Sequence, residues 1–356
     1  MRRQTVLHGR VIHGERIGRR LGFPTANLEQ SYFRTNPQRP GVYAAWIWRN
    51  RTRHDGLAVI GVPGQGFPHG KVELYLLDFS GSLYGETLTA QLLERIRPLI
   101  EYRRTETLVR RIKQDITAGH RVFARAEQFE KDKIAAVRRG VHELSSKFNR
   151  VRALIRVGRS EREVRDKLRR LFSKYQPSFP FIVASGPFGA FMHHVPTRRK
   201  LRRSDAVVVD FGIKVSGFCT DLTRTFFIGQ PTSLQRRRYE AVLRASALGG
   251  RAGQPFVMAR DVDRTVRGYL KQRQLARWFI HSTGHAVGKK IHEPPSLGPK
   301  SSGILLPGQV MTVEPGIYIP RWGGIRIEDM VQVSDRSSVV LTQNIPKNLH
   351  DIVVQV

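Results

Sequence analysis

The stretch AVVVDFGIKVSGFCTDLTRTFFIG, residues 206–229, contains two apolar runs that each meet an aspartate. The first run leads into Asp210, and the second begins directly after Asp221. Short runs of Val, Phe and Ile bounded by glycine are typical of buried β-strands. With Gly217 in the turn between them, the two strands are predicted to form a hairpin that brings both carboxylates together.

A second pair of acidic residues follows the same pattern further along the chain. Glu314 lies in TVEPGIY and Glu328 in GIRIEDM, and the segment between them contains Pro320 and two adjacent glycines. His285, in STGHAVG, adds a neutral nitrogen. The sequence therefore predicts that four carboxylates and one imidazole converge near the end of an apolar sheet.

Ionised carboxylates that converge in an apolar setting repel one another and lose hydration, at a cost of several kcal/mol per uncompensated charge. Two divalent cations would remove this problem. Oxygen and imidazole ligands suit Mn, Co, Zn or Fe, and bridging carboxylates hold two such ions roughly 3.5 to 4 Å apart. The single cysteine, Cys219, excludes a thiolate cage and an internal disulfide. Because a metal pair activates water and polarises a carbonyl, peptide hydrolysis is the expected chemistry.

The motifs that surround these residues strengthen the prediction, because their order along the chain and the spacings between them are specific. They are HHVPT, VVVDFG, TDLTRTF, STGHAVGKKIHE, TVEPGIYIP and GIRIEDM. Across residues 129–345 the chain resembles the proline-specific peptidases, Xaa-Pro aminopeptidase and Xaa-Pro dipeptidase. The resemblance implies the pita-bread α+β fold. The EPGIY and RIED motifs favour the proline-specific peptidases over the methionine aminopeptidases. The presence of all five ligand residues argues against the metal-free creatinases.

The resemblance also implies roles for individual residues. The implied ligands of a dinuclear metal centre are Asp210, Asp221, His285, Glu314 and Glu328, with Asp221 chelating one ion and Asp210 and Glu328 bridging. Glu314 would in addition act as the acid/base of the reaction.

Two histidines outside the metal ligands match those that hold the substrate and stabilise the oxyanion in this family, namely His193 and His292. His194 is the alternative to His193. Arg326 is a further expected substrate-binding residue. The usual motif of the family at residues 196–201 is PTDRKL, and this sequence has Arg198 in place of its aspartate.

A glycine-rich segment near the N-terminus carries a separate signature, GRVIHGERIGRRLGFPTANLE at residues 9–29. Its glycines allow close approach of a ligand to the backbone, and Thr25 and Asn27 offer oxygens suited to a magnesium-bound phosphate. The runs GVYAAWIW, VELYLLDFSGSLYGE and IRPLIEYRRTETLVRRIKQDI follow it. Residues 5–122 therefore resemble riboflavin kinase. The resemblance implies a six-stranded barrel that phosphorylates riboflavin to FMN, with Thr25 and Asn27 binding Mg-ATP and Glu73 as the base.

Helical patterns separate the two motif-bearing regions. Leu108, Ile112 and Ile116 form one apolar stripe, and this helix is expected to pack on the barrel. A second helical region is predicted to begin at Phe129. We place the domain boundary near residues 118–130, with a riboflavin-kinase-like barrel and its C-terminal helix at 1–125 and a pita-bread metallopeptidase domain at 126–356.

Residues after this boundary mix the two kinds of secondary structure. Ser160 and Glu163 form a capping-box pattern, and strands at 206–210 and 310–314 alternate with helical patterns at 233–248 and 259–273. The predicted fold class is thus a two-domain α+β protein, with a β-barrel followed by a pita-bread domain.

The net charge of the 356-residue chain is +32, which would attract polyanions non-specifically. Residues 1–127 carry 21 basic and 11 acidic side chains, so the excess is spread over both halves and indicates a generally basic surface rather than a nucleic-acid-binding arm. No stretch approaches the roughly 18 uncharged apolar residues of a membrane helix, and no apolar run of signal-peptide length follows the basic N-terminus. We therefore expect a cytoplasmic protein without a membrane partner, and a possible homodimer.

Three alternatives stay open at this point. The chain could be a basic binding protein that retains the pita-bread fold after catalysis has been lost. It could be a peptidase with another specificity, joined to a degenerate flavin- or nucleotide-binding barrel. If it cleaves Xaa-Pro bonds, the sequence does not decide between an aminopeptidase and a dipeptidase, nor does it identify the metal.

Overall fold

The computed structural model describes residues 5–15, 17–29, 38–63 and 70–355 of the chain. Its contacts divide the chain into two compact units, unit 1 from Met1 to Lys131 and unit 2 from Asp132 to Val356. The N-terminal glycine-rich segment is described except for residue 16. Each unit is considered by itself below.

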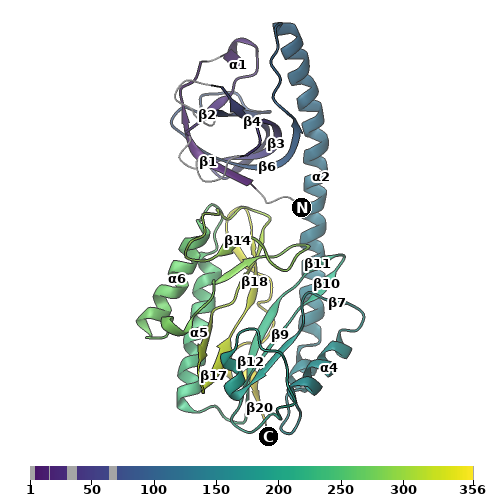
Figure 1. Ribbon diagram of the computed structural model, residues 1–356, viewed down its shortest axis with the longest axis vertical. Helices are drawn as coiled ribbons and strands as arrows, with labels where there is room; N and C mark the ends of the chain where they lie inside the picture. Colours follow the sequence, from purple (N-terminus) through teal and green to yellow (C-terminus); the bar gives the residue numbers. More distant parts are fainter. Residues whose placement is uncertain (1–4, 16, 30–37, 64–69, 356) are drawn as a thin grey trace. The chain divides into compact units, whose positions relative to one another are not determined.

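Unit 1 contains a closed six-stranded barrel, as the resemblance to riboflavin kinase implied (Figure 1). The strand order around the barrel is β1-β2-β5-β4-β3-β6. The bounds are β1 Thr5–Ile12, β2 Ala26–Leu28, β3 Gly41–Arg49, β4 Thr52–Val62, β5 Lys71–Leu76 and β6 Thr87–Arg97, with the short helix α1 at Ile17–Arg20. All neighbouring strands pair antiparallel, and closure leaves no unpaired edge in the barrel.

Alternating apolar side chains fill the barrel interior, among them Leu7, Ile47 and Leu74. The long helix α2, Thr105–Ser146, is held to the barrel by a buried ion pair. Arg97 at the end of β6 donates hydrogen bonds to both carboxylate oxygens of Asp115 on α2, over 2.8 to 3.0 Å. The expectation that this helix packs on the barrel is confirmed.

Helix α2 is continuous across the division between the units, so the prediction that a separate helical region begins at Phe129 was wrong. The division between Lys131 and Asp132 falls inside this helix. Residues 121–139 contain no glycine or proline, and nothing in this stretch interrupts the hydrogen-bond ladder of the helix.

Unit 2 is a mixed α+β structure with four sheets, and its buried apolar residues form more than one cluster. The helices are α3 Phe148–Arg152, α4 Glu161–Leu171, α5 Ser233–Ala252, α6 Ala259–Gln272 and α7 Leu349–Ile352, with the 3₁₀ helices η2 Gly186–Ala190 and η3 Ala276–Trp278. The strands are β7 Gln176–Pro177, β8 Ile182–Ser185, β9 Ala206–Phe211, β10 Ile213–Val215, β11 Phe218–Cys219, β12 Leu222–Ile228, β13 Gly284–Ala286, β14 Glu293–Leu297, β15 Val310–Val313, β16 Gly316–Ile319, β17 Gly323–Arg326, β18 Asp329–Val333, β19 Ser338–Val340 and β20 Val353–Val354.

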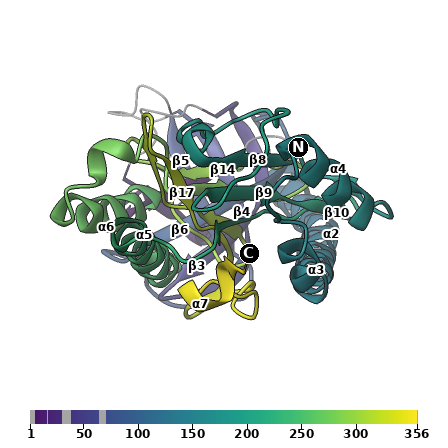
Figure 2. The same cartoon turned by 90° about the horizontal axis from the view of Figure 1, so that it is seen from below.

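Two of these sheets carry the candidate site. One has the order β20-β12-β9-β8, and the other the order β14-β13-β15-β18-β19. In Figures 1 and 2, helices α5 and α6 lie on one side of the strands of unit 2, and α3 and α4 lie on the other. The largest apolar cluster of the unit includes Val209, Phe211 and Phe226, which come from β9 and β12. Buried strands thus support the residues that follow them.

Local sequence signals account for the start of α4 and for the turn of the first hairpin. Ser160 accepts a hydrogen bond from the backbone of Glu163, and the Glu163 side chain accepts one from the backbone of Ser160, so the predicted capping box is confirmed. Gly217 has φ +79° in the turn between β10 and β11, a conformation that glycine adopts without strain. No helix within the described residues has the length and apolar character needed to cross a membrane.

Candidate metal and peptide site

The hairpin predicted from residues 206–229 forms and brings its two aspartates close together. Strands β9 and β12 pair antiparallel, with Phe211 opposite Leu222, so Asp210 and Asp221 lie at the same end of the pair. Both side chains are buried. Gly212 follows at a point where an added Cβ would lie 1.9 Å from the carbonyl oxygen of Thr220, so this hairpin has no room for a side chain there.

The second acidic pair comes from the neighbouring sheet. Strands β15 and β18 pair with Val313 opposite Asp329, which places Glu314 directly after one strand and Glu328 directly before the other. His285 lies on β13, which also pairs with β15. Three strands of one sheet therefore position the histidine and both glutamates.

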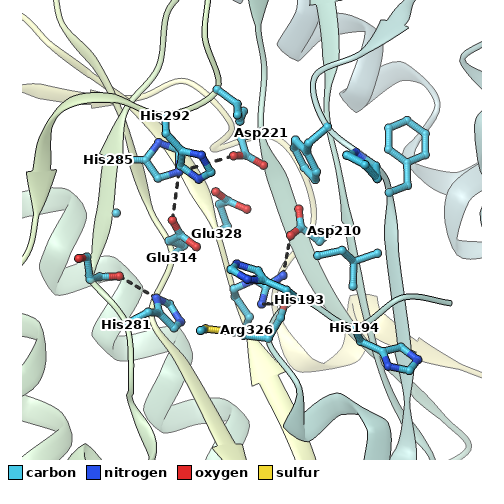
Figure 3. A pocket seen from close by; sticks show the side chains of 18 of the residues that line it. His193, His194, Asp210, Asp221, His281, His285, His292, Glu314, Arg326 and Glu328 are labelled. Atoms are coloured by element: carbon cyan, nitrogen blue, oxygen red, sulfur yellow. Dashed lines mark hydrogen bonds and ion pairs between the residues drawn. The ribbon is translucent and has the colours of Figure 1, made fainter. Parts of the chain in front are cut away.

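These residues meet in one place, as Figure 3 shows. Asp210, Asp221 and Glu328 each offer one carboxylate oxygen, and these oxygens all lie within 4.8 Å of one another. Nε2 of His285 lies 3.4 Å from Oε1 of Glu314 and 3.9 Å from Oδ2 of Asp221. All five residues named as ligands from the sequence line the same pocket.

Hydrogen bonds prepare His285 to bind a cation through Nε2. Its Nδ1 lies 3.1 Å from the carbonyl oxygen of Ala286, which can only accept, so this nitrogen carries the proton. When the ring is neutral, its lone pair is on Nε2, the nitrogen that faces the carboxylates.

Two carboxylate oxygens in the cluster are buried and lack a hydrogen-bond partner within the described part of the chain. They are Oδ1 of Asp210 and Oε1 of Glu328. The second oxygen of each residue is engaged, since Thr223 donates to Oε2 of Glu328 over 2.7 Å and Arg326 donates to Oδ2 of Asp210. A buried oxygen without a partner is costly unless a proton or a cation neutralises it. The donor set therefore fits divalent cations.

The electrostatics of the cluster lead to the same conclusion. Burial, together with the charges of Glu328 and Asp210, raises the pKa of Asp221 well above its usual range. Burial and the charges of Glu314 and Asp210 raise the pKa of Glu328 in the same way. Without cations these carboxylates cannot all ionise at low cost. A bound metal pair would supply the missing positive charge.

Glu314 differs from the other carboxylates because cationic groups surround it. Burial opposes its ionisation, but the hydrogen bond with His285 and the charge of His281 lower the pKa of Glu314 to about 2. The same contact raises the pKa of His285 against the effect of burial. Glu314 is thus the carboxylate of the cluster that ionises most readily.

The pocket has a volume of about 770 Å³, and apolar atoms contribute most of its lining surface. His193 and His292 both line it, and the rings of His292 and His285 lie 4.3 Å apart between centroids. Burial lowers the pKa of His292 and so favours the neutral ring. Both histidines stand beside the carboxylate cluster in Figure 3.

His194, the alternative to His193, is directed away from the cluster (Figure 3). Its Nε2 lies 2.8 Å from Oε2 of Glu161, a fully buried carboxylate at the start of α4. Glu161 also accepts hydrogen bonds from the backbone and hydroxyl groups of Ser185 and Thr197. This buried carboxylate ties the loop that carries His193 to α4 and β8.

Arg326 is buried, and each of its three nitrogens donates hydrogen bonds to the protein. Nε donates to Thr223, Nη1 to the hydroxyl of Tyr318 over 2.8 Å, and Nη2 to Asp210 over 2.5 Å. It also lines the pocket. Its recorded contacts hold Asp210 in place, and its expected contact with substrate stays a prediction.

Sequence reasoning passed over three residues that the structure places at or next to the site: Glu161, His281 and Tyr318. His281 Nε2 lies 2.9 Å from the hydroxyl of Tyr318, which in turn accepts from Arg326. Tyr318 lies inside the quoted TVEPGIYIP motif, which therefore contained a signal for it, whereas His281 lies just before the quoted STGHAVG motif. Glu161 had no such signal, because its acceptor role depends on a loop 24 to 36 residues away.

The barrel brings together the three residues expected to bind ATP and riboflavin. The hydroxyl of Thr25 donates to Oε2 of Glu73 over 3.0 Å, and Asn27 on β2 lies opposite Glu73 on β5. Gly14 lies so close to the amide of Asn27 that an added Cβ would be 2.1 Å from its nitrogen. The glycine-rich segment therefore packs directly on these polar side chains.

Comparison with known families agrees with both halves of this description. Residues 135–335 match metallopeptidase family M24, and the chain belongs to this family. Residues 1–123 match the riboflavin kinase family.

Among similar proteins is the Xaa-Pro dipeptidase of Pyrococcus furiosus, 39% identical over 189 residues, which are 52% of this chain and 54% of that protein. The structure of an Xaa-Pro dipeptidase from Bacillus anthracis is 36% identical, with a TM-score of 0.60 over 63% of each chain. That of an X-Pro aminopeptidase from Thermotoga maritima is 28% identical, with a TM-score of 0.60 over 64% of each chain. The chain spans about half the length of the curated relatives it matches.

Proposed function

We propose that unit 2 hydrolyses peptide bonds in which proline follows the first residue, using a dinuclear metal centre. The observation that carries this proposal is the convergence of Asp210, Asp221 and Glu328 within 4.8 Å, with two buried oxygens that lack hydrogen-bond partners among the described residues. Membership of family M24 and the similarity to Xaa-Pro peptidases give the reaction class.

Five residues would hold two divalent cations, with Mn, Co and Zn as the candidates: Asp210, Asp221, His285, Glu314 and Glu328. When bound, such cations supply Lewis-acid polarisation of a carbonyl and lower the pKa of water. Thr223 and Arg326 orient the ligands, since each occupies one oxygen of a carboxylate and leaves the other available.

Glu314 would accept the proton of the attacking water and return it to the departing nitrogen, because its low pKa keeps it ionised at neutral pH. His193 and His292 would donate hydrogen bonds to the substrate and to the oxyanion that forms at the scissile carbonyl. The apolar wall, which includes Phe181 and Ile182, would exclude water from the bound peptide.

The test uses the full chain. Metal analysis of the purified protein is combined with hydrolysis of Ala-Pro and Ala-Pro-Gly in the presence of added Mn²⁺. Cleavage of Ala-Pro-Gly but not Ala-Pro would assign an aminopeptidase, and the reverse a dipeptidase. Glu314→Ala should abolish turnover. Turnover that persists in this variant, or a protein that binds no divalent metal, would contradict the mechanism and favour a binding protein with a retained fold.

We further propose that the barrel phosphorylates riboflavin, because Thr25, directly before β2, and Asn27 on β2 lie beside Glu73 on β5. Thr25 and Asn27 would bind Mg-ATP. Glu73 would accept the proton of the ribityl hydroxyl while that oxygen bonds to the γ-phosphorus and ADP departs. ATP-dependent formation of FMN, lost in Glu73→Gln, tests the proposal. A barrel that binds flavin or nucleotide without forming FMN would instead be a degenerate binding domain.

A further inference from the structure

The segment of unit 2 from residue 147 to 203 is the most basic part of the chain that lies beside the pocket. It carries 16 of the 61 Lys and Arg residues but only 3 of the 29 Asp and Glu residues. One of those three acids, Glu161, is buried and faces inward. The charge on the surface of this segment is therefore strongly positive.

Two parts of the segment run side by side. Ser160 and Lys200 form an antiparallel bridge, and the backbone nitrogen of Arg162 donates to the carbonyl of Thr197 over 3.0 Å. The backbone nitrogen of Gly158 likewise donates to Leu201 over 2.9 Å. Residues 158–162, which lead into α4, are thus hydrogen-bonded to residues 197–201.

Residues 198–202 alternate between the interior and the surface. Arg199 points inward, where it donates to Ser185 and to both oxygens of Asp205, and Leu201 is buried. Arg198, Lys200 and Arg202 are exposed. Because alternate residues of an extended segment face the same side, these three cations share one face.

Helix α4 continues this face toward the pocket. Its buried side consists of Glu161, Val164 and Leu168. Arg162 and Arg165 are one helical turn apart, about 4.5 Å along the axis. Arg162 donates to the carbonyl of Pro196, and both Pro196 and Arg165 line the pocket. We call Arg162, Arg165, Arg198, Lys200 and Arg202 the basic strip.

Little negative charge offsets this strip. Asp166 pairs with Arg165 and Glu163 pairs with Lys200, in both cases at half-exposed carboxylates where solvent screens the interaction. Arg162, Arg198 and Arg202 form no ion pair with a described residue. These three arginines are therefore exposed and uncompensated, on the same segment as Arg165 and Pro196, which line the pocket.

From this geometry we infer that the basic strip binds acidic residues on the C-terminal side of the scissile bond, so that acidic peptides are preferred substrates. The inference rests on the proposed peptidase function. An extended peptide spans up to about 3.5 Å per residue, so residues beyond the scissile bond would leave the pocket beside Arg165 and Pro196, where the strip begins. Attraction between an acidic peptide and the basic strip would speed their association, and salt would weaken this attraction.

A peptide fits the strip better than a nucleic acid does. The strip begins at the pocket that would hold the peptide, because Arg165 lines that pocket. Glu163 and Asp166 interrupt the strip, which leaves separate cationic positions rather than a continuous track for a phosphate backbone.

The test compares three peptides of equal length, Ala-Pro-Ala-Glu-Glu, Ala-Pro-Ala-Gln-Gln and Ala-Pro-Ala-Lys-Lys, with Mn²⁺ present. At about 20 mM salt, kcat/KM for the Glu peptide should exceed that for the Gln peptide about threefold to tenfold, and the difference should vanish at about 500 mM salt. The Lys peptide should be the poorest substrate.

Charge reversal in R198E/R202E should remove the preference, because neither side chain forms a recorded hydrogen bond or ion pair that folding would lose. The matched control is R236E/R237E, which makes the same charge change at exposed arginines of α5, on the other side of the strands (Figure 2). This control should keep the preference. R198K/R202K should keep it as well.

A second measurement separates this inference from the proposed function. Binding of the fluorescently labelled Glu and Gln peptides to the full-length Glu314→Ala variant needs no turnover. If the Gln peptide is cleaved but all three peptides have equal kcat/KM, the inference is overturned and the peptidase stands. If neither these peptides nor Ala-Pro is cleaved but the Glu peptide binds more tightly through Arg198 and Arg202, the strip is supported and the peptidase is overturned. If a single-stranded oligonucleotide binds more tightly than the Glu peptide, and its binding also depends on Arg198 and Arg202, the peptide assignment is overturned.

Discussion

Arg326 holds Asp210 by a hydrogen bond of 2.5 Å between Nη2 and Oδ2, and both side chains are buried. The second carboxylate oxygen, Oδ1, has no hydrogen-bond partner among the described residues. The arginine thus fixes the rotamer of Asp210 while leaving one oxygen for a cation. Tyr318 and His281 extend this contact into a chain that ends at the carbonyl of Ser282.

Replacement of Arg326 should weaken both metal binding and stability. Arg326→Met leaves the buried carboxylate of Asp210 without its partner, a loss of about 3 to 5 kcal/mol in the free energy of unfolding of unit 2. Arg326→Lys keeps the charge but not the planar arrangement of donors, so its loss should be smaller. Calorimetry with Mn²⁺ and with chelator measures both effects. Unchanged Mn²⁺ affinity in Arg326→Met would show that the arginine does not position the ligand.

Removal of metal should destabilise unit 2, because cations bind the folded cluster and not the unfolded chain. At a free Mn²⁺ concentration of 100 times Kd the stabilisation is about 2.7 kcal/mol. Glu328→Gln removes one of the crowded carboxylates, so the metal-free variant should unfold at a higher temperature than the metal-free wild type and gain less from Mn²⁺. Equal gains in the two proteins would mean that Glu328 is not a ligand.

Ionised Glu161 should stabilise unit 2, so the free energy of unfolding of this unit should decrease at acidic pH. Burial raises its pKa, but hydrogen bonds from Ser185, Thr197 and His194 outweigh this and lower the pKa below its ordinary value of 4.5. A lowered folded-state pKa gives stability that is complete above the ordinary value and is lost as the pH falls through the folded-state pKa. Denaturant titrations between about pH 7 and pH 3 measure this dependence.

Glu161→Gln should lose about 1 to 3 kcal/mol at pH 7, since donors that now bond to a carboxylate would face an amide. The variant and the wild type should converge as the pH falls below 4.5, the ordinary value for this group. Asp166→Asn is the matched control, because Asp166 is exposed on the same helix. If Glu161→Gln and wild type differ equally at all pH values, the ionised form of Glu161 is not the stabilising one.

The ion pair between Arg97 and Asp115 should be essential to unit 1. Both side chains are buried, and Asp115→Ala would leave the guanidinium without its carboxylate, a loss of about 3 to 5 kcal/mol. The double variant R97M/D115L, which replaces the pair by apolar groups, should recover most of this loss. Thermal unfolding of the full chain provides the measurement. A double variant as unstable as Asp115→Ala would point to packing rather than charge.

Much of the site could be predicted from the sequence because its ligands directly adjoin apolar strands. Asp210, Asp221, Glu314 and Glu328 each stand within one residue of a buried strand, and antiparallel pairing carries them to the same place. The six-stranded barrel could likewise be expected from its short β-type runs and its resemblance to riboflavin kinase.

Partners distant in sequence could not be predicted. Nothing near Glu161 indicates that Ser185, Thr197 and His194 donate to it, because these contacts depend on the three-dimensional course of a loop. For the same reason, the sequence did not indicate that Thr223 donates a hydrogen bond to Glu328 and Arg326 one to Asp210. The apolar pattern around Phe129 predicted the start of a separate helix, but helix α2 runs through this residue. An apolar stripe that shifts around one long helix gives the same pattern as the start of a second helix.

The passage from one unit to the other inside α2 affects how either unit could be produced separately. Cutting the chain after Lys131 would divide the helix in the middle of a turn. Each fragment would then carry backbone groups that have lost their partners one turn away, four N–H groups on one side and four carbonyls on the other. The two new ends would fray into water, so separately made halves would each need an engineered helix stop where the native chain has none.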